Sequence, residues 1–358
     1  MIKPFSKPGK KELGHEYIDG EEEGIISEMI QELKDQLNRL YPTQKMLRQV
    51  HTKMHGCVRG KFIIEPGLPD DLRVGVFKDA VSYPAWIRFS NANTIPQPDK
   101  KKDIRGIAIK LMDVPGDKIL NDQSHSDSQD FLLMSSETFF AKNLKHFRKL
   151  LKTASGKNKL SLLAFFLNPF HWKMLVRIMK SNIECMHPFE IPYWSTQPYQ
   201  YGTGSKAVKY SVQPSVNNEL SYTGSTDDNY LRLNMAETLE TKEIDFNFFI
   251  QFQMDAEKMP IEDPTVRWTS PFIKVATLKI PSQTFDAPQQ LEFGDDLSFS
   301  PWHSLPEHRP LGSFNRARRR VYEELSQFRH DRNGIKVFEP APFQSVPEIQ
   351  EKSEHKTT

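Results

Sequence analysis

One tyrosine near the C-terminal end of the chain lies within a run of arginines, in the segment RRRVYEELSQFRH at residues 318–330. At about 3.6 residues per helical turn, Arg318 lies one turn before Tyr322 and Arg329 two turns after it, so all three project from nearly the same face. A free phenol has a pKa near ~10, and a nearby cation favours its ionised form. Such a face suits a phenolate, which binds ferric iron. The alternative is a solvated basic helix whose aromatic side chain packs inward.

A strand far upstream carries an arginine and a serine on one face. In WIRFSNA, alternation puts Trp86, Arg88 and Ser90 on one side and Ile87 and Phe89 on the other. A buried charge without a partner is costly, so these polar groups need a polar partner inside the predicted barrel. A dianionic ligand would supply one.

A histidine and an arginine lie close together further upstream, in LRQVHTKMHG. Arg48 precedes His51 by three residues. A histidine taken alone is more often a surface or core residue than a catalyst. Its interpretation therefore depends on the motifs that follow it.

The elements that position these residues follow from hydrophobic spacing. Residues 22–39 have the period of an amphipathic helix, residues 137–183 are mostly helical, and the arginine segment predicts a helix at about 314–328. Short extended runs bounded by turn residues predict strands in GKFIIEP, AWIRFSNA, RGIAIKLM, DFLLMS, KAVKYSVQP, DFNFFIQFQMD and FIKVATLKIP. We therefore expect an α+β fold with an antiparallel barrel or sheet at its centre and helices around it.

Composition excludes some classes of protein. The 358 residues include 48 basic and 46 acidic ones, and this balance argues against a nucleic-acid binder with a broad basic surface. The two cysteines, Cys57 and Cys185, are too few and too far apart for a disulfide framework or a Cys-rich zinc site. We interpret them as ordinary thiols.

No segment predicts secretion or a membrane span. The N-terminal sequence MIKPFSKPGKKELGHEY has no apolar stretch of the signal-peptide type, and we expect a soluble, cytoplasmic protein. The most apolar stretch, residues 160–179, is interrupted by Asn168-Pro169 and charged by Lys173 and Arg177. Two interpretations stay open for it: peripheral contact with a membrane surface, or packing against the core.

Five motifs in a fixed order resemble the haem catalase family over most of residues 45–340. They are Arg48-Gln-Val-His51-Thr-Lys53, Arg88-Phe89-Ser90, Arg105-Gly106-Ile-Ala108-Ile-Lys110, Arg318-Arg-Arg-Val-Tyr322, and Arg329 seven residues beyond the tyrosine. Each motif alone is weak, and their order makes the match specific. The segments YWSTQPY and SFSPWHSLPEHRPLGSFNRARR further resemble the short catalase-like proteins of bacteria.

The resemblance implies a catalase-like antiparallel β-barrel core in a single haem-binding domain. It places the haem domain at 45–340. Helical spacing predicts an N-terminal arm and helix at 1–44, and polar composition predicts a disordered tail at 341–358. The implied cofactor is haem b, with Tyr322 as the ligand of the iron and Arg318 holding it as phenolate. The same resemblance gives Arg48, Arg88 and Arg329 the haem propionates.

The resemblance also implies the catalytic residues. His51 would be the base on the opposite side of the haem, with Ser90 hydrogen-bonded to its imidazole. Asp127, in SDSQDFLL, aligns with the asparagine that catalases place beside that histidine. An ionised aspartate accepts a hydrogen bond but cannot donate one, so we expect rapid disproportionation of hydrogen peroxide to be impaired.

Three functions follow from the resemblance, in order of preference. The first is a catalase-like enzyme or peroxidase that cleaves hydrogen peroxide or organic peroxides, with an electron donor as a further partner. The second converts fatty-acid hydroperoxides, as allene oxide synthase-like enzymes do. The third is a haem-binding protein without turnover, which would need no base such as His51. The oligomeric state stays open.

Overall fold

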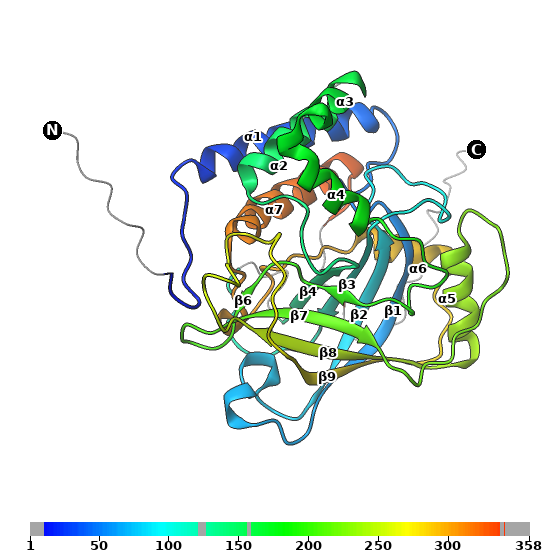
Figure 1. Ribbon diagram of the computed structural model, residues 1–358. Coiled ribbons are helices and arrows are strands. Elements are labelled where there is room, and N and C mark those ends of the chain that lie inside the picture. The colour runs from blue at the N-terminus through cyan, green and yellow to red at the C-terminus, as the bar shows by residue number, and fades with distance from the viewer. Residues whose placement is uncertain (1–10, 121–126, 156–158, 337–339, 341–358) are drawn as a thin grey trace, which may run out of the picture.

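A closed antiparallel barrel forms the centre of the protein (Figure 1). The computed structural model describes residues 11–120, 127–155, 159–336 and 340. Within these ranges the strands are β1 Lys53–Ile64, β2 Ser82–Asn91, β3 Arg105–Leu111, β4 Gln129–Met134, β5 Tyr193–Trp194, β6 Tyr199–Gln200, β7 Ala207–Pro214, β8 Ile244–Phe252 and β9 Phe272–Ile280. The order β5-β4-β3-β2-β1-β9-β8-β7-β6, with β5 also paired to β7, closes eight strands, and β6 extends from β7.

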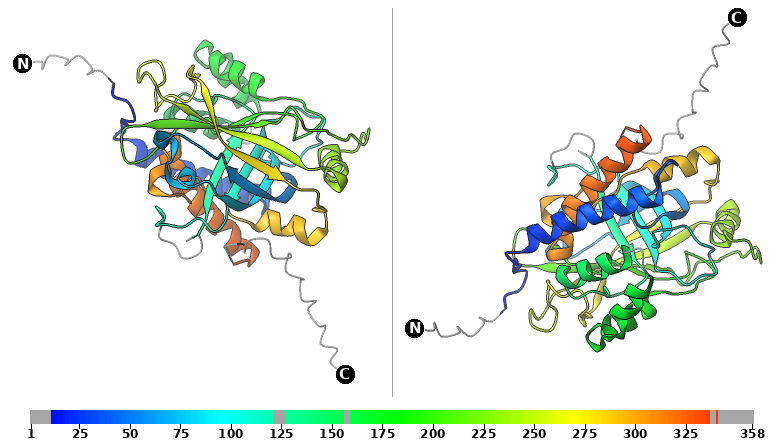
Figure 2. Two further views of the ribbon diagram at one scale, coloured as in Figure 1. Left: turned by 90° about the horizontal axis from the view of Figure 1, so that it is seen from below. Right: turned by 90° about the horizontal axis from the view of Figure 1, so that it is seen from above.

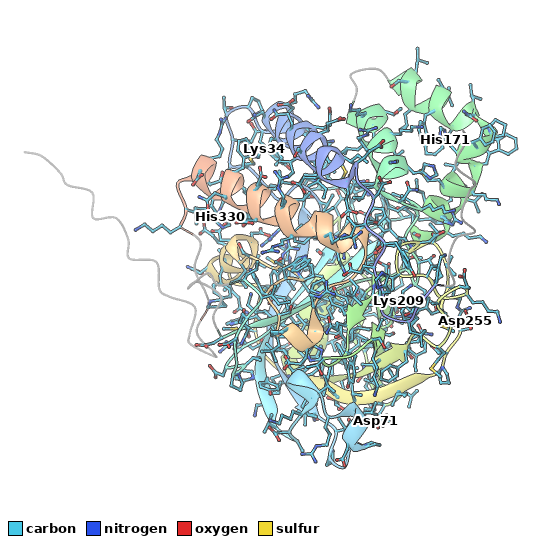
Figure 3. The ribbon with its side chains drawn as sticks, turned by 90° about the vertical axis from the view of Figure 1, so that its left-hand side faces the viewer. Lys34, Asp71, His171, Lys209, Asp255 and His330 are labelled. Carbon is cyan, nitrogen blue, oxygen red and sulfur yellow. The ribbon has the colours of Figure 1, made fainter. Side chains whose placement is uncertain are left out.

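Helices surround the barrel (Figure 2). In the described ranges they are α1 Glu22–Leu40, α2 Leu144–Ser155, α3 Lys159–Leu167, α4 Trp172–Ser181, α5 Tyr230–Thr241, α6 Pro288–Asp296 and α7 Ser313–Asn333. Helix α1, which carries Lys34, lies across α7 (Figure 3). An ion pair between Lys34 Nζ and Glu324 Oε2 at 2.8 Å joins the two helices. None of these helices combines the length and apolar character needed to cross a bilayer.

The barrel interior is filled by apolar side chains. Ile87 and Phe89 of β2 point into it, as their alternation predicts. At its centre the Phe248 ring packs edge-on against Phe62 and Phe131, with centroid distances of 4.9 Å to each. Because side chains fill this space, a ligand must bind outside the barrel wall.

Residues with opposite strand parity point outward. Trp86 of β2 packs with Met54 and Leu297 in a separate cluster that lies outside the barrel interior, between the wall and α6. The same parity carries Arg88 and Ser90 to this outer layer. Their polar partners are therefore outside the barrel, and the expectation of partners inside it is wrong because the interior-facing positions of β2 are Ile87 and Phe89.

The observed elements confirm the expected α+β architecture and extend it. Helix α7 continues five residues past the expected end, to Asn333, where Gly334 at φ 66° terminates it. Helix α6 lies between the last expected strand and the expected arginine helix, where no element was predicted. Its sequence PQQLEFGDD has little hydrophobic periodicity, and tertiary contacts hold it: Gln290 Nε2 donates to the Cys57 carbonyl oxygen at 2.8 Å.

The expected N-terminal arm is attached to the rest of the protein by ion pairs. Helix α1, from the expected N-terminal arm, is tied to α7 by the Arg316 guanidinium, which donates to both carboxylate oxygens of Glu22 at 2.7 and 2.8 Å. The expected tail at 341–358 lies outside the described residues. The boundaries at 44 and 340 stay predictions.

The aromatic packing inside the barrel predicts where stability resides. Phe248→Ala should lower the free energy of unfolding by about 3–5 kcal/mol, because it leaves a cavity between Phe62 and Phe131. Phe249→Ala is the matched control, since Phe249 is the next residue on β8 and is half-buried on the outer face. It should cost roughly 1 kcal/mol. Denaturant unfolding of both variants measures the difference, and equal losses would contradict the assignment of the core.

Candidate functional site

His51 and Ser90 form the centre of the candidate site. His51 lies two residues before the start of β1, with a left-handed backbone at φ 57° that histidine adopts more readily than most residues. Its backbone N–H donates to the Ala92 carbonyl oxygen at 3.2 Å, which fixes the chain beside the end of β2. The ring Nδ1 lies 3.0 Å from Ser90 Oγ. The serine therefore sets the ring orientation and leaves Nε2 for another partner.

Gly106 of β3 lies directly beside the His51 imidazole and leaves space for it. A Cβ atom at position 106 would lie 2.4 Å from His51 Cε1 and 2.5 Å from Nδ1, well inside contact distance. It would also lie 3.3 Å from Ser90 Oγ. Only glycine leaves room for the ring in this position, which gives the glycine of the Arg105-Gly106 motif a role that sequence reasoning had not assigned.

The surroundings of His51 keep its ring neutral. Burial, followed by the positive charges of Arg88, Arg318 and Arg48, lowers the pKa of His51 to about 3. A neutral imidazole near pH 7 can accept a proton at one ring nitrogen. The same electrostatic coupling shows that α7, through Arg318, lies near a histidine more than 260 positions upstream.

Three arginines converge next to this pair, and we call Arg48, Arg88 and Arg329 the arginine cluster. Arg88 Nη2 donates to the His51 carbonyl oxygen at 3.0 Å and to Asp295 Oδ1 at 3.2 Å. Arg48 Nη2 and Arg329 Nη1 each donate to the Asp295 carbonyl oxygen at 2.9 Å. The end of α6 is thus the meeting point of cations from a loop, a strand and α7.

The cluster is electrostatically unfavourable by itself. Burial, and then the charges of Arg88 and Arg329, lower the pKa of Arg48 well below its usual range. Burial also lowers the pKa of Arg329 to about 10, against the opposing effect of Asp296. The buried Nε atoms of Arg48 and Arg88 have no hydrogen-bond partner in the described part of the chain. Asp295 compensates part of this charge, and a further anion would compensate more.

Arg318 and Tyr322 lie one turn apart on α7, both half-buried. Arg318 Nη1 donates to Asn315 Oδ1 at 3.1 Å, and Asn315 is itself anchored through its Nδ2, which donates to the Pro198 carbonyl oxygen at 2.9 Å. Tyr199 lies nearby with a buried hydroxyl that has no partner among the described residues. Burial and the proximity of Tyr322 raise the pKa of Tyr199 to about 12, while Arg318 opposes this rise.

The other arginines of α7 serve packing. Arg316 pairs with Glu16, Glu22 and Glu262. Burial lowers the pKa of Arg316, but Glu22 and Glu262 outweigh this effect and raise it. Arg320 pairs with Glu23 and Glu324. These ion pairs attach α7 to α1 and neighbouring loops.

Asp127 lies away from His51. Gly106, which touches the His51 ring, pairs with Met134, whereas Gln129 at the start of β4 pairs with Leu111. Five residues along β3 separate these ends by about 17 Å. Asp127 comes two residues before Gln129, is exposed, and accepts a hydrogen bond through its carbonyl oxygen from Val114 N at 2.9 Å. The structure does not bring its carboxylate to the candidate site.

Two other motif residues hold the segment behind His51. Lys53 Nζ pairs with the buried Asp99 carboxylate at 2.6 Å, and Arg105 Nη1 donates to Asn91 Oδ1. Asp99 also accepts from the Leu231 backbone N–H at 3.0 Å. Sequence reasoning missed Asp99 and Asp295 because each carboxylate binds residues that are distant in the chain. The only local signal was the pair of neighbouring acidic residues at 295–296.

Comparisons with known proteins identify the fold. No family model matches the sequence, and no curated protein is detectably similar to it. Among solved structures, a fungal catalase matches with a TM-score of 0.64 at 17% identity, covering 99% of this chain and 73% of the catalase. Catalase A from Saccharomyces cerevisiae gives 0.64 at 16%, covering 99% and 76%, and a bacterial catalase gives 0.61 at 14%, covering 90% and 68%. The expected catalase-like fold is confirmed, and at these identities the likeness concerns the fold alone.

The contact between Gly106 and His51 predicts a measurable titration. In the wild type, the His51 imidazole should titrate at about 3, far below the ~6.5 of a free histidine. Gly106→Ala should displace the ring from Ser90, expose it, and raise its pKa toward ~6.5. Nuclear magnetic resonance of the histidine Cε1 atoms, with His51 assigned by its loss in His51→Gln, measures both values.

The sign of the accompanying stability change follows from proton binding. Between pH ~6.5 and about 3 the unfolded chain binds a proton at residue 51 that the folded protein does not, so the free energy of unfolding falls as the pH falls through this window. Gly20→Ala is the control, because a Cβ there meets nothing within 4 Å. An unchanged His51 titration in Gly106→Ala would show that the glycine does not position the ring.

Proposed function

We propose that this chain, which has a catalase-like fold, is a haem-dependent enzyme that cleaves hydrogen peroxide or organic peroxides. The observation that carries the proposal is the neutral His51, held by Ser90 at 3.0 Å beside the arginine cluster. A base with a free ring nitrogen next to an anion site is what peroxide cleavage requires. A protein that only stores a ligand needs no such base.

The residues of the site fit haem b. Its two propionates are anions, and the arginine cluster has buried Nε atoms of Arg48 and Arg88 without partners, so carboxylates there would reduce an existing electrostatic cost. Tyr322 offers a phenol oxygen between Arg318 and Arg329 on α7. We assign Tyr322 to the iron and the arginine cluster to the propionates.

Each group of the site has a separate role in peroxide cleavage under these assignments. Haem iron, when bound, supplies the redox chemistry that breaks the oxygen–oxygen bond. His51 Nε2 accepts a proton from the peroxide and returns it to the departing oxygen, so no free hydroxide leaves. Ser90 keeps the ring oriented, and Gly106 leaves space for it. Arg318 acts electrostatically on both His51 and the region of Tyr322.

A second substrate class has its own support. Exposed apolar side chains can contact the hydrocarbon chain of a fatty-acid hydroperoxide. Leu163, Leu167 and Phe170 are 60%, 70% and 92% exposed. The electron donor and the cytoplasmic location stay predictions.

Tyr322→Phe tests the cofactor assignment. The variant keeps the ring and removes the oxygen ligand, so it should lose the phenolate-type ferric absorption and most of the bound haem after reconstitution. Tyr222→Phe is the matched control, because Tyr222 is half-exposed and bonds to Glu190 Oε2 at 3.0 Å. The measurement is an absorption spectrum and a haem titration. An identical spectrum in Tyr322→Phe would remove Tyr322 from the iron site.

His51→Ala tests the catalytic assignment separately. This variant should retain haem while its rate of peroxide cleavage falls by ~100- to 10,000-fold, the range for removal of a general acid–base group. The assay compares hydrogen peroxide, cumene hydroperoxide and a linoleic acid hydroperoxide in stopped flow, which also ranks the substrate classes. Wild-type rates for all three substrates in His51→Ala would exclude His51 as the base.

A further inference from the structure

A long segment of the chain contains only positive charge. Between Thr138 and Ile183 the sequence has ten lysines and arginines and no aspartate or glutamate. The remainder of the chain holds the other 38 basic residues against all 46 acidic ones. This segment forms α2, α3 and α4, so one region of a nearly neutral protein is strongly basic.

Helix α3 has two apolar faces. Leu162, Phe165 and Phe166 pack against the cluster that includes α1 and α7. Leu160, Leu163 and Leu167 share the other side at spacings of three and four residues, and they are 60–70% exposed. Packing of the helix onto the protein therefore uses only half of its apolar surface.

Helix α4 repeats this arrangement. Met174 and Ile178 face the same cluster, while Trp172, Val176 and Met179 form an exposed row. Phe170, in the single turn between the two helices, is 92% exposed. We call the seven exposed side chains the α3–α4 surface: Leu160, Leu163, Leu167, Phe170, Trp172, Val176 and Met179.

Cations accompany this surface. Lys173, Arg177 and Lys180 lie on α4, and no ion pair joins them to an acid in the described part of the chain. Lys173 and Arg177 line an open hollow of about 340 Å³ together with Trp172 and Val176. By contrast, Arg148 and Lys152 of α2 are paired with Glu28 of α1. The unpaired cations of α4 therefore lie beside the exposed apolar side chains.

We propose that the α3–α4 surface docks the protein on the surface of an anionic lipid bilayer. Apolar side chains with tryptophan at the level of the headgroups and lysines on the adjoining face are the features of helices that lie in a membrane interface. Helices of nine and ten residues are about 14 and 15 Å long, too short to span a bilayer and suited to lie in its plane.

The position of the surface suits this role. His171, between α3 and α4, lies at the periphery of the molecule on the green helices, away from Asp71 on the opposite side of the barrel (Figure 3). A second copy of the chain is a poorer occupant, because a symmetric dimer through this surface would bring like charges together. The inference goes beyond the proposed peroxide chemistry and does not depend on haem.

Vesicle flotation of the full-length protein tests the proposal. The protein should float with phosphatidylcholine vesicles that contain phosphatidylglycerol and bind pure phosphatidylcholine vesicles far more weakly. Raising the salt from ~0.1 to ~0.5 M should reduce binding, since the cations are exposed. Phe170→Ser and Trp172→Ser should each weaken binding roughly 10- to 100-fold through lost apolar burial. Lys173→Ala with Arg177→Ala should weaken it about 30-fold.

Matched controls are available elsewhere on the surface. Val216→Ser changes an apolar residue that is 98% exposed, and Lys61→Ala with Lys78→Ala removes two exposed cations outside the basic segment. Both control variants should bind as the wild type does. Because the assay contains no peroxide and reads no haem, its result is independent of the enzymatic proposal.

Several outcomes would overturn the proposal. Failure of the wild type to float with the anionic vesicles is one, and equal losses in the α3–α4 and control variants is another. Concentration-dependent dimers that Phe170→Ser dissociates, without vesicle binding, would assign the surface to a second copy. Thermal unfolding of every variant verifies that each one is folded.

Discussion

The site depends on one electrostatic constraint, the cost of holding three guanidinium groups close together out of water. Arg48, Arg88 and Arg329 come from a loop, a barrel strand and the last helix, and they meet at the end of α6. Each would be destabilising if buried alone, because desolvation of a charge exceeds what an imperfect partner returns. The Asp295 carboxylate and several carbonyl oxygens supply part of the compensation. The remaining unpartnered nitrogen atoms make this region receptive to an anion.

The barrel makes this arrangement possible by separating two environments. Its interior is an apolar core around Phe248, which holds the strands rigidly. Its outer wall presents Arg88 and Ser90 at fixed positions on β2, with Gly106 beside them on β3. Helix α7 then closes the site from the outside, attached to α1 by the ion pairs of Arg316. The strands thus position His51, and a helix fixed by charges brings Tyr322 and two further arginines.

Helices α2, α3 and α4, which pack on the other side of α1, differ from α7 in their charge and exposure. Those in the segment from 138 to 183 are basic, and two of them, α3 and α4, remain apolar on the side that faces away from the protein. A solvent-facing row with this composition is unusual for a monomer in water. The two interpretations left open for residues 160–179 are compatible, since one face packs against the core and the other is exposed.

The sequence by itself determined the elements whose signals are local. The period of α1, the alternation on β2 and the order of the five motifs were enough for the α+β architecture, the catalase-like fold and the pairing of His51 with Ser90. The tertiary structure alone decided the rest. In the folded protein the polar face of β2 lies outside the barrel, and α6 forms from a segment without periodicity. Gly106 leaves space for the His51 ring, Asp295 accepts hydrogen bonds from the arginine cluster, and Asp127 lies exposed near the far end of β3. The physical reason is that these outcomes depend on contacts between segments distant in the chain, such as a glycine that leaves space for a ring some 50 residues away, and such contacts leave no periodic trace in either segment.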